Sequence, residues 1–387
     1  MRSPGAPSVR GMVNRLRLPS TVVVTLAAAL ALSACGDDTP TASAGGAENP
    51  GGAGSPSSGG DLSGTLSLSG ASSQESAMTA WIAGYQQVQP DVTVHYDAVG
   101  SGAGRENLIS GASPMIGSDA YLDEEERAAV VEQCGPGGAL HLPAYISPVA
   151  IPYNLPGVDR LNLSPENLAR IFNQEITRWD DPALAADNPD VELPATDITV
   201  VNRSDESGTT ENFTEYLAAA AGDAWPHEPS GEWPVAGGEA AAQTTGVIQV
   251  VQSTEGAIGY ADASAVGQLS TAAIGVGDDF VEFSPEAAAA VVDASEPVDT
   301  GVEGDLALEL ARDTTEEGTY PIVLVSYEIA CTHYEDATTG GLVKDFLRYV
   351  LSEEGQQAAA EAAGSAPVSD ELREQAYDAI DSITVGD

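Results

Sequence analysis

Basic residues are scarce in this 387-residue chain. Fourteen Lys and Arg face 59 Asp and Glu, which gives a formal net charge of −45, and Lys344 is the only lysine. Nucleic-acid binding draws most of its affinity from clustered Lys and Arg, so nucleic acid is excluded as a partner. No run of 18 or more apolar residues, no sustained heptad and no Gly triplet repeat is present. A multi-span membrane protein, a coiled coil and collagen are therefore excluded.

Motifs of metal and nucleophilic catalysis are also missing. The four histidines are far apart, none belongs to an H-x-x-x-H or Cys-His arrangement, and none lies beside a Gly-x-Ser-x-Gly elbow. Neither Gly-Lys-Ser nor Gly-Lys-Thr occurs, so a Walker loop is absent. We therefore expect no catalytic residue, no metal and no cofactor, and we interpret the histidines as surface or structural residues. They are His95, His141, His227 and His333.

The chain begins with a segment unlike the rest. Residues 1–35 hold four arginines and no acid, and an apolar run from Thr21 to Ala34 ends in Leu-Ser-Ala-Cys35. This pattern predicts a signal peptide, too short in its apolar part for a membrane span. Its end resembles a bacterial lipobox, in which Cys35 becomes the lipidated N-terminus. The alternative is an ordinary secretory signal with an incidental cysteine.

Removing residues 1–35 would take away four arginines and no acid, so the formal charge would change from −45 to −49. Residues 36–60, which follow, are nearly all Gly, Ser, Pro, Ala and Thr with a few acids, and predict a flexible linker with a mean reach of about 25–30 Å. Two cysteines remain beyond it, Cys134 and Cys331. In a compartment that permits disulfides they predict one bond, with two buried thiols as the alternative.

From Asp61 onward, short strand patterns alternate with amphipathic helix patterns. This alternation predicts an α/β fold with mainly parallel sheets, in which Met78 and the aromatic residues at helical spacing belong to the core. The predicted strands include Leu66/Leu68, Val92/Val94, Ile198–Val201, Ala257–Tyr260 and Ile322–Val325. The predicted helices include Met78–Tyr85, one beginning at Leu108/Ile109, Phe213–Leu217 and Val343–Leu351.

Three strand-to-helix junctions are rich in Ser and Gly, namely Ser69–Ser73, Gly100–Gly104 and Ser204–Thr210. Each offers free backbone N–H groups and a hydroxyl at a helix N-terminus, where the helix dipole favours an anion. Ser72 with Glu75 also fits a capping box. The acidic run 123–126 is most simply a solvated helix start. Because Arg203 directly precedes the third junction, the three together predict an oxyanion site.

These loops resemble those of a known family. The quoted motifs are Ser69-Gly-Ala-Ser-Ser-Gln74, Val99-Gly-Ser-Gly-Ala-Gly-Arg105, Gly117-Ser-Asp-Ala-Tyr-Leu122, Arg203-Ser-Asp-Glu-Ser-Gly-Thr209 and Gly256-Ala-Ile-Gly-Tyr260. In this order they resemble the phosphate-binding lipoproteins of bacterial phosphate ABC importers, the PstS family, and in particular its actinobacterial type. The resemblance covers nearly all of residues 61–365.

The resemblance implies a type II periplasmic-binding-protein fold, in which two α/β lobes joined by two hinge strands close on a ligand. Lobe I would comprise residues 61–146 plus 325–387, and lobe II residues 147–324. The crossings would fall near 146–152 and 320–325.

The resemblance also implies the ligand contacts, residue by residue. Other branches of the family carry Thr-Phe where this chain has Ser72-Ser73, and Asp205 corresponds to the acid that holds the arginine. The phosphate-binding set would be Ser72, Ser73, Ser101, Asp119, Arg203, Ser207, Gly208 and Thr209.

The function implied is capture of inorganic phosphate by a monomer, lipid-anchored on the extracytoplasmic face of the cell membrane, and delivery to the membrane permease subunits of a phosphate ABC importer. A strongly negative chain repels anions at long range, so a preorganised cleft must do the capturing. Two alternatives stay open, a binder of sulfate or molybdate and a phosphoester hydrolase. A site made only of donors would favour the first, and the acceptor Asp119 argues against it.

Overall fold

The computed structural model describes residues 62–386. The predicted signal peptide, Cys35 and the whole predicted linker lie outside these residues. Within the described part of the chain, no helix combines the length and the apolar character that crossing a bilayer requires.

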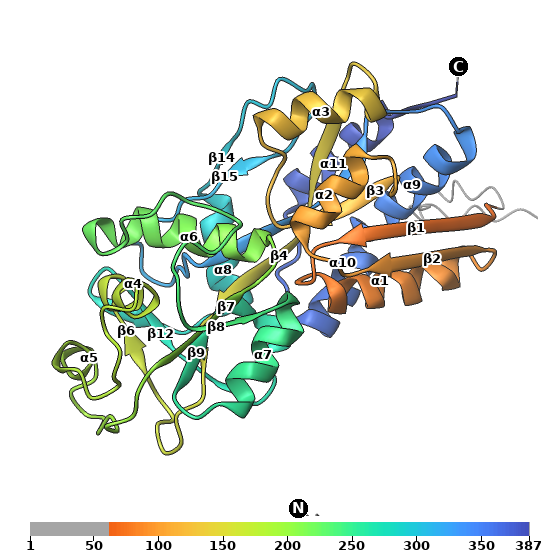
Figure 1. The fold of residues 1–387 in the computed structure, drawn as a ribbon. Helices are drawn as coiled ribbons and strands as arrows, with labels where there is room; N and C mark the ends of the chain where they lie inside the picture. Colours follow the sequence, from red (N-terminus) through yellow and green to blue (C-terminus); the bar gives the residue numbers. More distant parts are fainter. Residues whose placement is uncertain (1–61, 387) are drawn as a thin grey trace, which may run out of the picture. The chain divides into compact units, whose positions relative to one another are not determined.

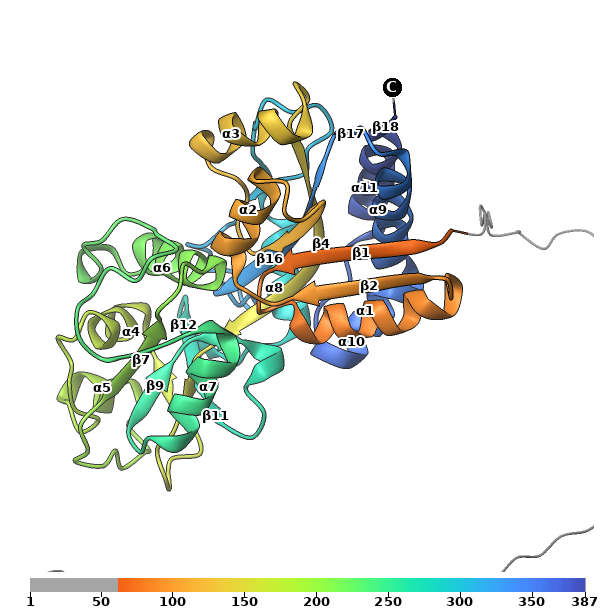
Figure 2. The ribbon, with the colours of Figure 1, turned by 45° about the vertical axis from the view of Figure 1, so that its right-hand side comes forward.

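The first lobe is built on a six-stranded sheet with the order β10-β4-β16-β3-β1-β2. Helices α1 and α10 pack against each other, as do α9 and α11, which lie side by side in Figure 2. Met78, Trp81 and Tyr85 of α1 are fully buried, as predicted. The strands are β1 Gly64–Gly70, β2 Val92–Asp97, β3 Met115–Ser118, β4 Ala139–Ala150, β10 Ala261–Asp262 and β16 Val323–Cys331. The helices are α1 Glu75–Val88, α2 Ser101–Ile109, α3 Glu124–Cys134, α9 Ala337–Val350, α10 Glu353–Ala363 and α11 Asp370–Ser382.

The second lobe holds a five-stranded sheet, β11-β5-β9-β7-β8, and a three-stranded sheet, β13-β12-β6. Figure 1 labels β6, β7, β8, β9 and β12 of these strands. Helix α7 packs on the five-stranded sheet, and α8 lies against β4 and β16. The strands are β5 Pro152–Tyr153, β6 Asn162–Leu163, β7 Thr199–Arg203, β8 Glu239–Ala241, β9 Ala257–Gly259, β11 Ser270–Thr271, β12 Ala273–Val276 and β13 Asp279–Val281. The helices are α4 Pro165–Phe172, α5 Pro182–Asp187, α6 Gly208–Ala220, α7 Gln243–Ser253 and α8 Pro285–Asp293, with 3-10 turns at Gly222–Ala224 and Ala263–Ala265.

The sheets are mixed, which corrects the prediction of mainly parallel sheets. Strands β1, β2 and β3 pair in parallel, as do β7, β8 and β9, but β16 pairs antiparallel with both β3 and β4. Strands β4 and β16 are buried along their whole length, and such strands look alike in sequence whichever way they pair.

Most predicted elements are present, and one boundary is wrong. Leu108 and Ile109 end helix α2, which begins at Ser101, whereas the sequence predicted that they begin a helix. The helix start in the acidic run is confirmed, because Asp123 caps α3 and forms a capping box with Glu126. The misplaced start has a simple cause: α2 opens with Ser-Gly-Ala-Gly, which carries no apolar periodicity.

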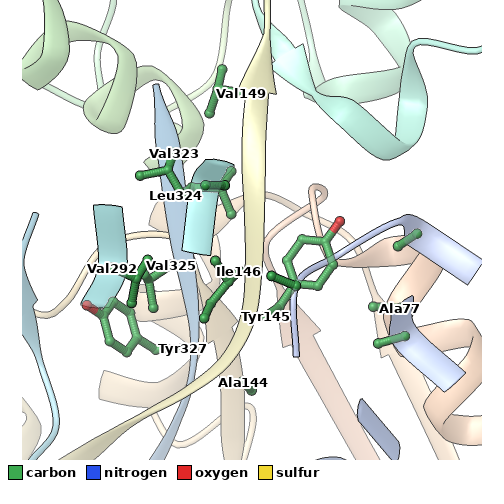
Figure 3. Close-up of a cluster of buried hydrophobic side chains, with 14 of the residues drawn as sticks. Ala77, Ala144, Tyr145, Ile146, Val149, Val292, Val323, Leu324, Val325 and Tyr327 are labelled. Carbon is green, nitrogen blue, oxygen red and sulfur yellow. The ribbon is translucent and has the colours of Figure 1, made fainter. Parts of the chain in front are cut away.

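Two neighbouring strands carry the chain between the lobes. Strand β4 runs directly into β5 of the second lobe, and the chain returns through β16, which pairs with β4 from Cys331↔Ala139 to Val323↔Pro148. Figure 3 shows Ile146 and Val149 on the side of β4 that faces Val323 and Leu324 of β16, with Tyr145 on the other side of the strand. All five side chains are buried. The two crossings are therefore one hydrogen-bonded, apolar ribbon.

A short hairpin rests on the first lobe. It is formed by β14 Glu296–Pro297 and β15 Leu308–Glu309. Between them, Asp305 accepts from the backbone N–H of His141 at 2.5 Å and lies 2.9 Å from His141 Nδ1. The other ring nitrogen, Nε2, accepts from the backbone N–H of Leu122 at 3.0 Å. His141 is thus a buried structural histidine that joins the hairpin to the loop after β3.

A last small pair of strands, β17 His333–Tyr334 and β18 Thr384–Val385, joins the C-terminal end of the described chain to the first lobe.

The two cysteines of the body form a disulfide bond in the structure. Cys134 ends helix α3 and Cys331 ends strand β16, 197 residues later in the chain. Both side chains are buried in the first lobe.

Asp262 introduces a buried acid beside the hinge. It pairs with Val149 of β4, and its Oδ1 accepts from the Tyr145 hydroxyl at 3.0 Å and from the Ser264 N–H at 2.9 Å. Its Oδ2 has no hydrogen-bond partner among the described residues. Burial is the main cause that raises the pKa of Asp262 to about 6, while the hydroxyl of Ser264 acts in the opposite direction.

We predict that Asp262→Asn changes the pH dependence of stability. An acid with a raised pKa in the folded state binds its proton more tightly there than in the unfolded chain, so stability falls as pH rises from about 4 to about 6. The variant should lack this fall and should gain about 1–3 kcal/mol relative to wild type between pH 4 and pH 7.5. Urea unfolding at both pH values measures the difference. An equal difference at the two pH values would contradict the prediction.

Candidate functional site

The predicted loops meet at Asp119, directly after strand β3. Its side chain is buried, and three hydroxyl groups donate to it from three separate elements. Ser73, just before α1, donates to Oδ1 at 2.6 Å, and Ser326 of β16 donates to the same oxygen at 2.6 Å. Thr209 of α6 donates to Oδ2 at 2.8 Å. Because Thr209 belongs to the second lobe and Asp119 to the first, the two lobes are in contact through this carboxylate.

The carboxylate has room for one more donor. An ionised carboxylate offers about four acceptor positions, two on each oxygen. Oδ1 already accepts hydrogen bonds from two hydroxyl groups, and Oδ2 accepts one. One position on Oδ2 therefore stays open to a group that brings a proton.

Two helix N-termini face each other at this point. Helix α2 begins at Ser101, whose Oγ accepts from the Asp119 N–H at 3.2 Å, and α6 begins at Gly208. Ser207 caps α6, since its Oγ accepts from the Thr210 N–H at 3.2 Å. Free N–H groups and the positive ends of two helix dipoles are thus directed at one place, which favours an anion.

Arg203 supplies the cation at the end of β7. Its side chain is 2% exposed, and it donates to Asp205 from Nε at 2.9 Å and from Nη2 at 2.5 Å. Its backbone N–H donates to the Tyr260 hydroxyl at 3.1 Å. Burial tends to raise the pKa of Asp205, but the hydrogen bonds and charge of Arg203 outweigh it and the pKa lies below its usual value. Asp205 therefore stays ionised and fixes the orientation of the guanidinium.

Ser72 does not join the hydroxyls around Asp119. Its Oγ lies 3.0 Å from Thr244 Oγ1 and accepts from the Thr244 N–H at 3.2 Å, at the start of α7 in the second lobe. The capping box with Glu75 does not form, because Gln74 occupies the N-cap position of α1 and makes no side-chain cap bond. Ser72 is instead a contact between the lobes.

Three polar residues of the site were missed by the sequence analysis: Ser326, Asn212 and Thr244. Asn212 donates from Nδ2 to the Asp119 carbonyl and to the Gly208 carbonyl, both at 2.7 Å. The signal for Asn212 was its position four residues after Gly208, one helical turn from the loop. Ser326 directly follows the predicted strand Ile322–Val325, a place where a buried hydroxyl needs a partner.

An ion pair closes the rim of the site. Arg105 of α2 donates to Glu206 of the second lobe at 2.6 Å and to Glu126 of α3 at 2.7 Å. A Cβ atom on Gly102 would collide with the Glu206 side chain, so the second glycine of Gly-Ser-Gly-Ala-Gly makes room for this contact. Within residues 62–386, no group of three or more His, Cys, Asp or Glu side chains is arranged to hold a metal ion.

We predict that Gly208→Ala weakens ligand binding by holding the lobes apart. A Cβ atom there would lie 2.7 Å from Asp119 Cβ and 2.8 Å from Ser101 Oγ, both in the first lobe. Overpacking of this kind costs about 1–3 kcal/mol, or roughly 5- to 150-fold in affinity. Titration calorimetry with the ligand measures it. Gly341→Ala, in α9 with no described atom within 4 Å of the new methyl group, is the matched control. Equal affinity of both variants would contradict the prediction.

Two α/β lobes, joined by a pair of strands and meeting at a buried carboxylate among hydroxyls, helix N-termini and one arginine, define a two-lobed binding protein. A model of the PBP superfamily domain matches residues 55–354. The solved phosphate binding protein from Stenotrophomonas maltophilia shares this fold, with a TM-score of 0.62 at 20% identity over 82% of this chain and 94% of that chain.

Relatives in sequence narrow the class. Phosphate-binding protein PstS3 of Mycobacterium bovis is 36% identical over 373 residues, 95% of this chain and 99% of its own length. Phosphate-binding protein PstS of Methanocaldococcus jannaschii is 32% identical over 296 residues, 70% of this chain and 75% of its own length. The chain belongs to the PstS family of phosphate-binding proteins. The resemblance noted in the loop motifs is thereby confirmed.

Proposed function

We propose that this protein captures inorganic phosphate between its lobes and delivers it to a phosphate ABC importer. The observation that carries the proposal is the bonding of Asp119, which accepts hydroxyl protons from both lobes and keeps one acceptor position open. Phosphate is an anion that still carries a proton to donate at neutral pH, so it suits donors and an acceptor in one site. The family and the names of the relatives support the same reading.

The phosphate contacts follow from this arrangement. Arg203 and the N-termini of α2 and α6 would donate hydrogen bonds to the charged oxygens of phosphate. The open position on Asp119 would accept a hydrogen bond from the protonated oxygen. Charge-assisted hydrogen bonds of this kind are short and about twice as strong as neutral ones. The contact set we propose is Ser73, Ser101, Asp119, Arg203, Ser207, Gly208 and Thr209, with Ser72 beside it at the contact between the lobes.

The cellular setting is part of the proposal. Cys35 would carry the lipid anchor on the extracytoplasmic face of the cell membrane, residues 36–60 would act as the tether, and permease subunits would receive the phosphate. The binding unit would be a monomer with lobe I at residues 61–146 plus 325–387 and lobe II at residues 147–324. Binding rather than catalysis is favoured because the relatives are named as binding proteins.

Sulfate or molybdate binding is the competing function. Fully deprotonated anions would meet the Asp119 carboxylate as a like charge, so the site favours phosphate over them. A phosphoester hydrolase would need a nucleophile or metal beside the same anion cradle.

Titration calorimetry of the chain from residue 36 onward, against phosphate, sulfate and a phosphomonoester, tests the proposal. We expect one phosphate site per chain and a smaller radius of gyration in small-angle scattering when phosphate is bound. Absence of phosphate binding would refute the proposed function. Tighter binding of sulfate would favour the competing one, and turnover of the phosphomonoester would identify an enzyme.

A further inference from the structure

A second buried arginine lies close to the site without belonging to any of the motifs. Arg312 follows the hairpin strand β15 and precedes the hinge strand β16, and its side chain is 5% exposed. It lines a cavity of about 600 Å³ between α6, the hairpin and the loop after β3. Asp119 and Asn212 line the same cavity.

Each nitrogen of the Arg312 guanidinium is committed to a protein acceptor. Nε and Nη2 donate to Glu215 of α6 at 3.0 and 2.7 Å, and Nη1 donates to the carbonyl of Val323 at 2.7 Å. Nη2 also donates to Oδ1 of Asn212. A planar fork can reach these three partners at once, whereas the single ammonium of lysine cannot do so in the same geometry.

This contact decides which way the Asn212 amide points. Arginine has only donors, so the oxygen of the amide must face it, and the Nδ2 group must face the opposite side. There it donates to the Asp119 carbonyl and the Gly208 carbonyl. Arg312 therefore sets the orientation in which α6 of the second lobe holds the backbone of Asp119 in the first.

The same guanidinium reaches the hinge. Val323 is the first residue of β16, and Ser326, three residues further on, donates to the Asp119 carboxylate. Two chains of contacts therefore link Arg312 to Asp119. One runs through the side chain of Asn212, and the other runs through Val323 along β16 to Ser326. Because four of its five N–H groups are already bound to protein acceptors, we assign Arg312 an indirect role at the site.

We propose that Arg312 is a positioning residue for anion capture. It fixes Asn212 so that α6 clamps Asp119 when the lobes close, and it ties this clamp to the hinge strand. The inference rests on the proposed function and assigns a cation to the site that acts through another side chain.

A double-mutant cycle tests the proposal. Arg312→Met, Asn212→Ala and the double variant are compared with wild type for phosphate Kd by calorimetry and for phosphate dissociation by stopped flow. We expect Arg312→Met to weaken phosphate binding about 10- to 100-fold, mainly through faster dissociation. In the Asn212→Ala background the same change should cost less than about threefold, because the group through which Arg312 acts is already gone.

Controls separate positioning from a general loss of structure. Arg178→Met removes an exposed arginine paired with Asp180 and Asp197 and should leave phosphate affinity unchanged. Arg312→Lys keeps the charge without the fork and should also weaken binding. If Arg312→Met does not fold, the lysine variant takes its place in the cycle, and thermal unfolding is recorded for every variant.

The outcomes are distinct. Wild-type affinity in folded Arg312→Met or Arg312→Lys overturns the proposal, and so do losses that add in full to that of Asn212→Ala. Absence of phosphate binding by wild type refutes the proposed function instead, and the same cycle is then measured with sulfate. Strong coupling between the two residues in that anion's affinity would still support the role of Arg312.

Discussion

An Asp119→Asn variant is expected to lose most of the discrimination between phosphate and sulfate. In the wild type, sulfate has no proton for the open position on Oδ2 and faces the carboxylate as a like charge in a buried site. Such a mismatch costs about 4 kcal/mol, which corresponds to roughly a thousandfold in affinity. The amide removes the charge and supplies a donor. The ratio of the affinities for phosphate and sulfate should therefore fall, chiefly because sulfate binds more tightly. Competition calorimetry with both anions measures the ratio.

The matched control for Asp119 is Asp205→Asn. It removes one negative charge from the same site, but from the partner of Arg203 and not from an acceptor with an open position. It should change the affinities for phosphate and sulfate by similar factors and leave their ratio nearly unchanged. A folded Asp119→Asn variant that binds phosphate and rejects sulfate as strictly as wild type would refute the role of Asp119 in selectivity.

Loss of the disulfide is expected to destabilise the protein by about 3–5 kcal/mol. The bond between Cys134 and Cys331 closes a loop of 197 residues, which restricts the unfolded chain strongly in the chain-entropy model. Urea unfolding of a Cys134→Ser/Cys331→Ser variant and of wild type, each with and without reductant, measures the difference. Reductant should lower the stability of wild type only. Two alkylated thiols in unreduced protein, detected by intact mass, would show that the bond is absent in solution.

Local sequence was sufficient to predict the loops of the site. A close approach of backbone to an anion needs Gly and a hydroxyl at the start of a helix. Consecutive residues meet this requirement at Gly100–Gly104 and at Arg203–Thr209. The arginine and its acid, Arg203 and Asp205, are two residues apart and could be found together. The contact between Arg203 and Asp205 spans only two positions, and a single sequence reveals a contact of that kind.

Contacts between distant segments could not be predicted in this way. Ser326 is 207 residues from Asp119, and its neighbours form an apolar strand that looks like any core strand. The partner of Arg105 lies 101 residues away, and that of Arg312 lies 100 residues away. Each pairing depends on the tertiary fold, and the pairing of Arg105 with Glu206 depends in addition on how the two lobes meet. The antiparallel pairing of β16 was hidden for a related reason, because a strand buried on both faces shows no alternation that reports its neighbours.

The central place of β16 in the six-stranded sheet has a consequence for the order of events during synthesis. Strands β3 and β4 are synthesised early, but they do not pair with each other. Strand β16 lies between them and pairs with both, and it is synthesised only after residue 322. Until then the sheet exists at best as two halves, Asp119 lacks Ser326, and Cys134 lacks its partner. Strand β16 is therefore needed for three events: assembly of the first lobe, formation of the disulfide bond and binding of the ligand. A nascent chain that has not released this strand is expected to bind no anion, however complete its second lobe.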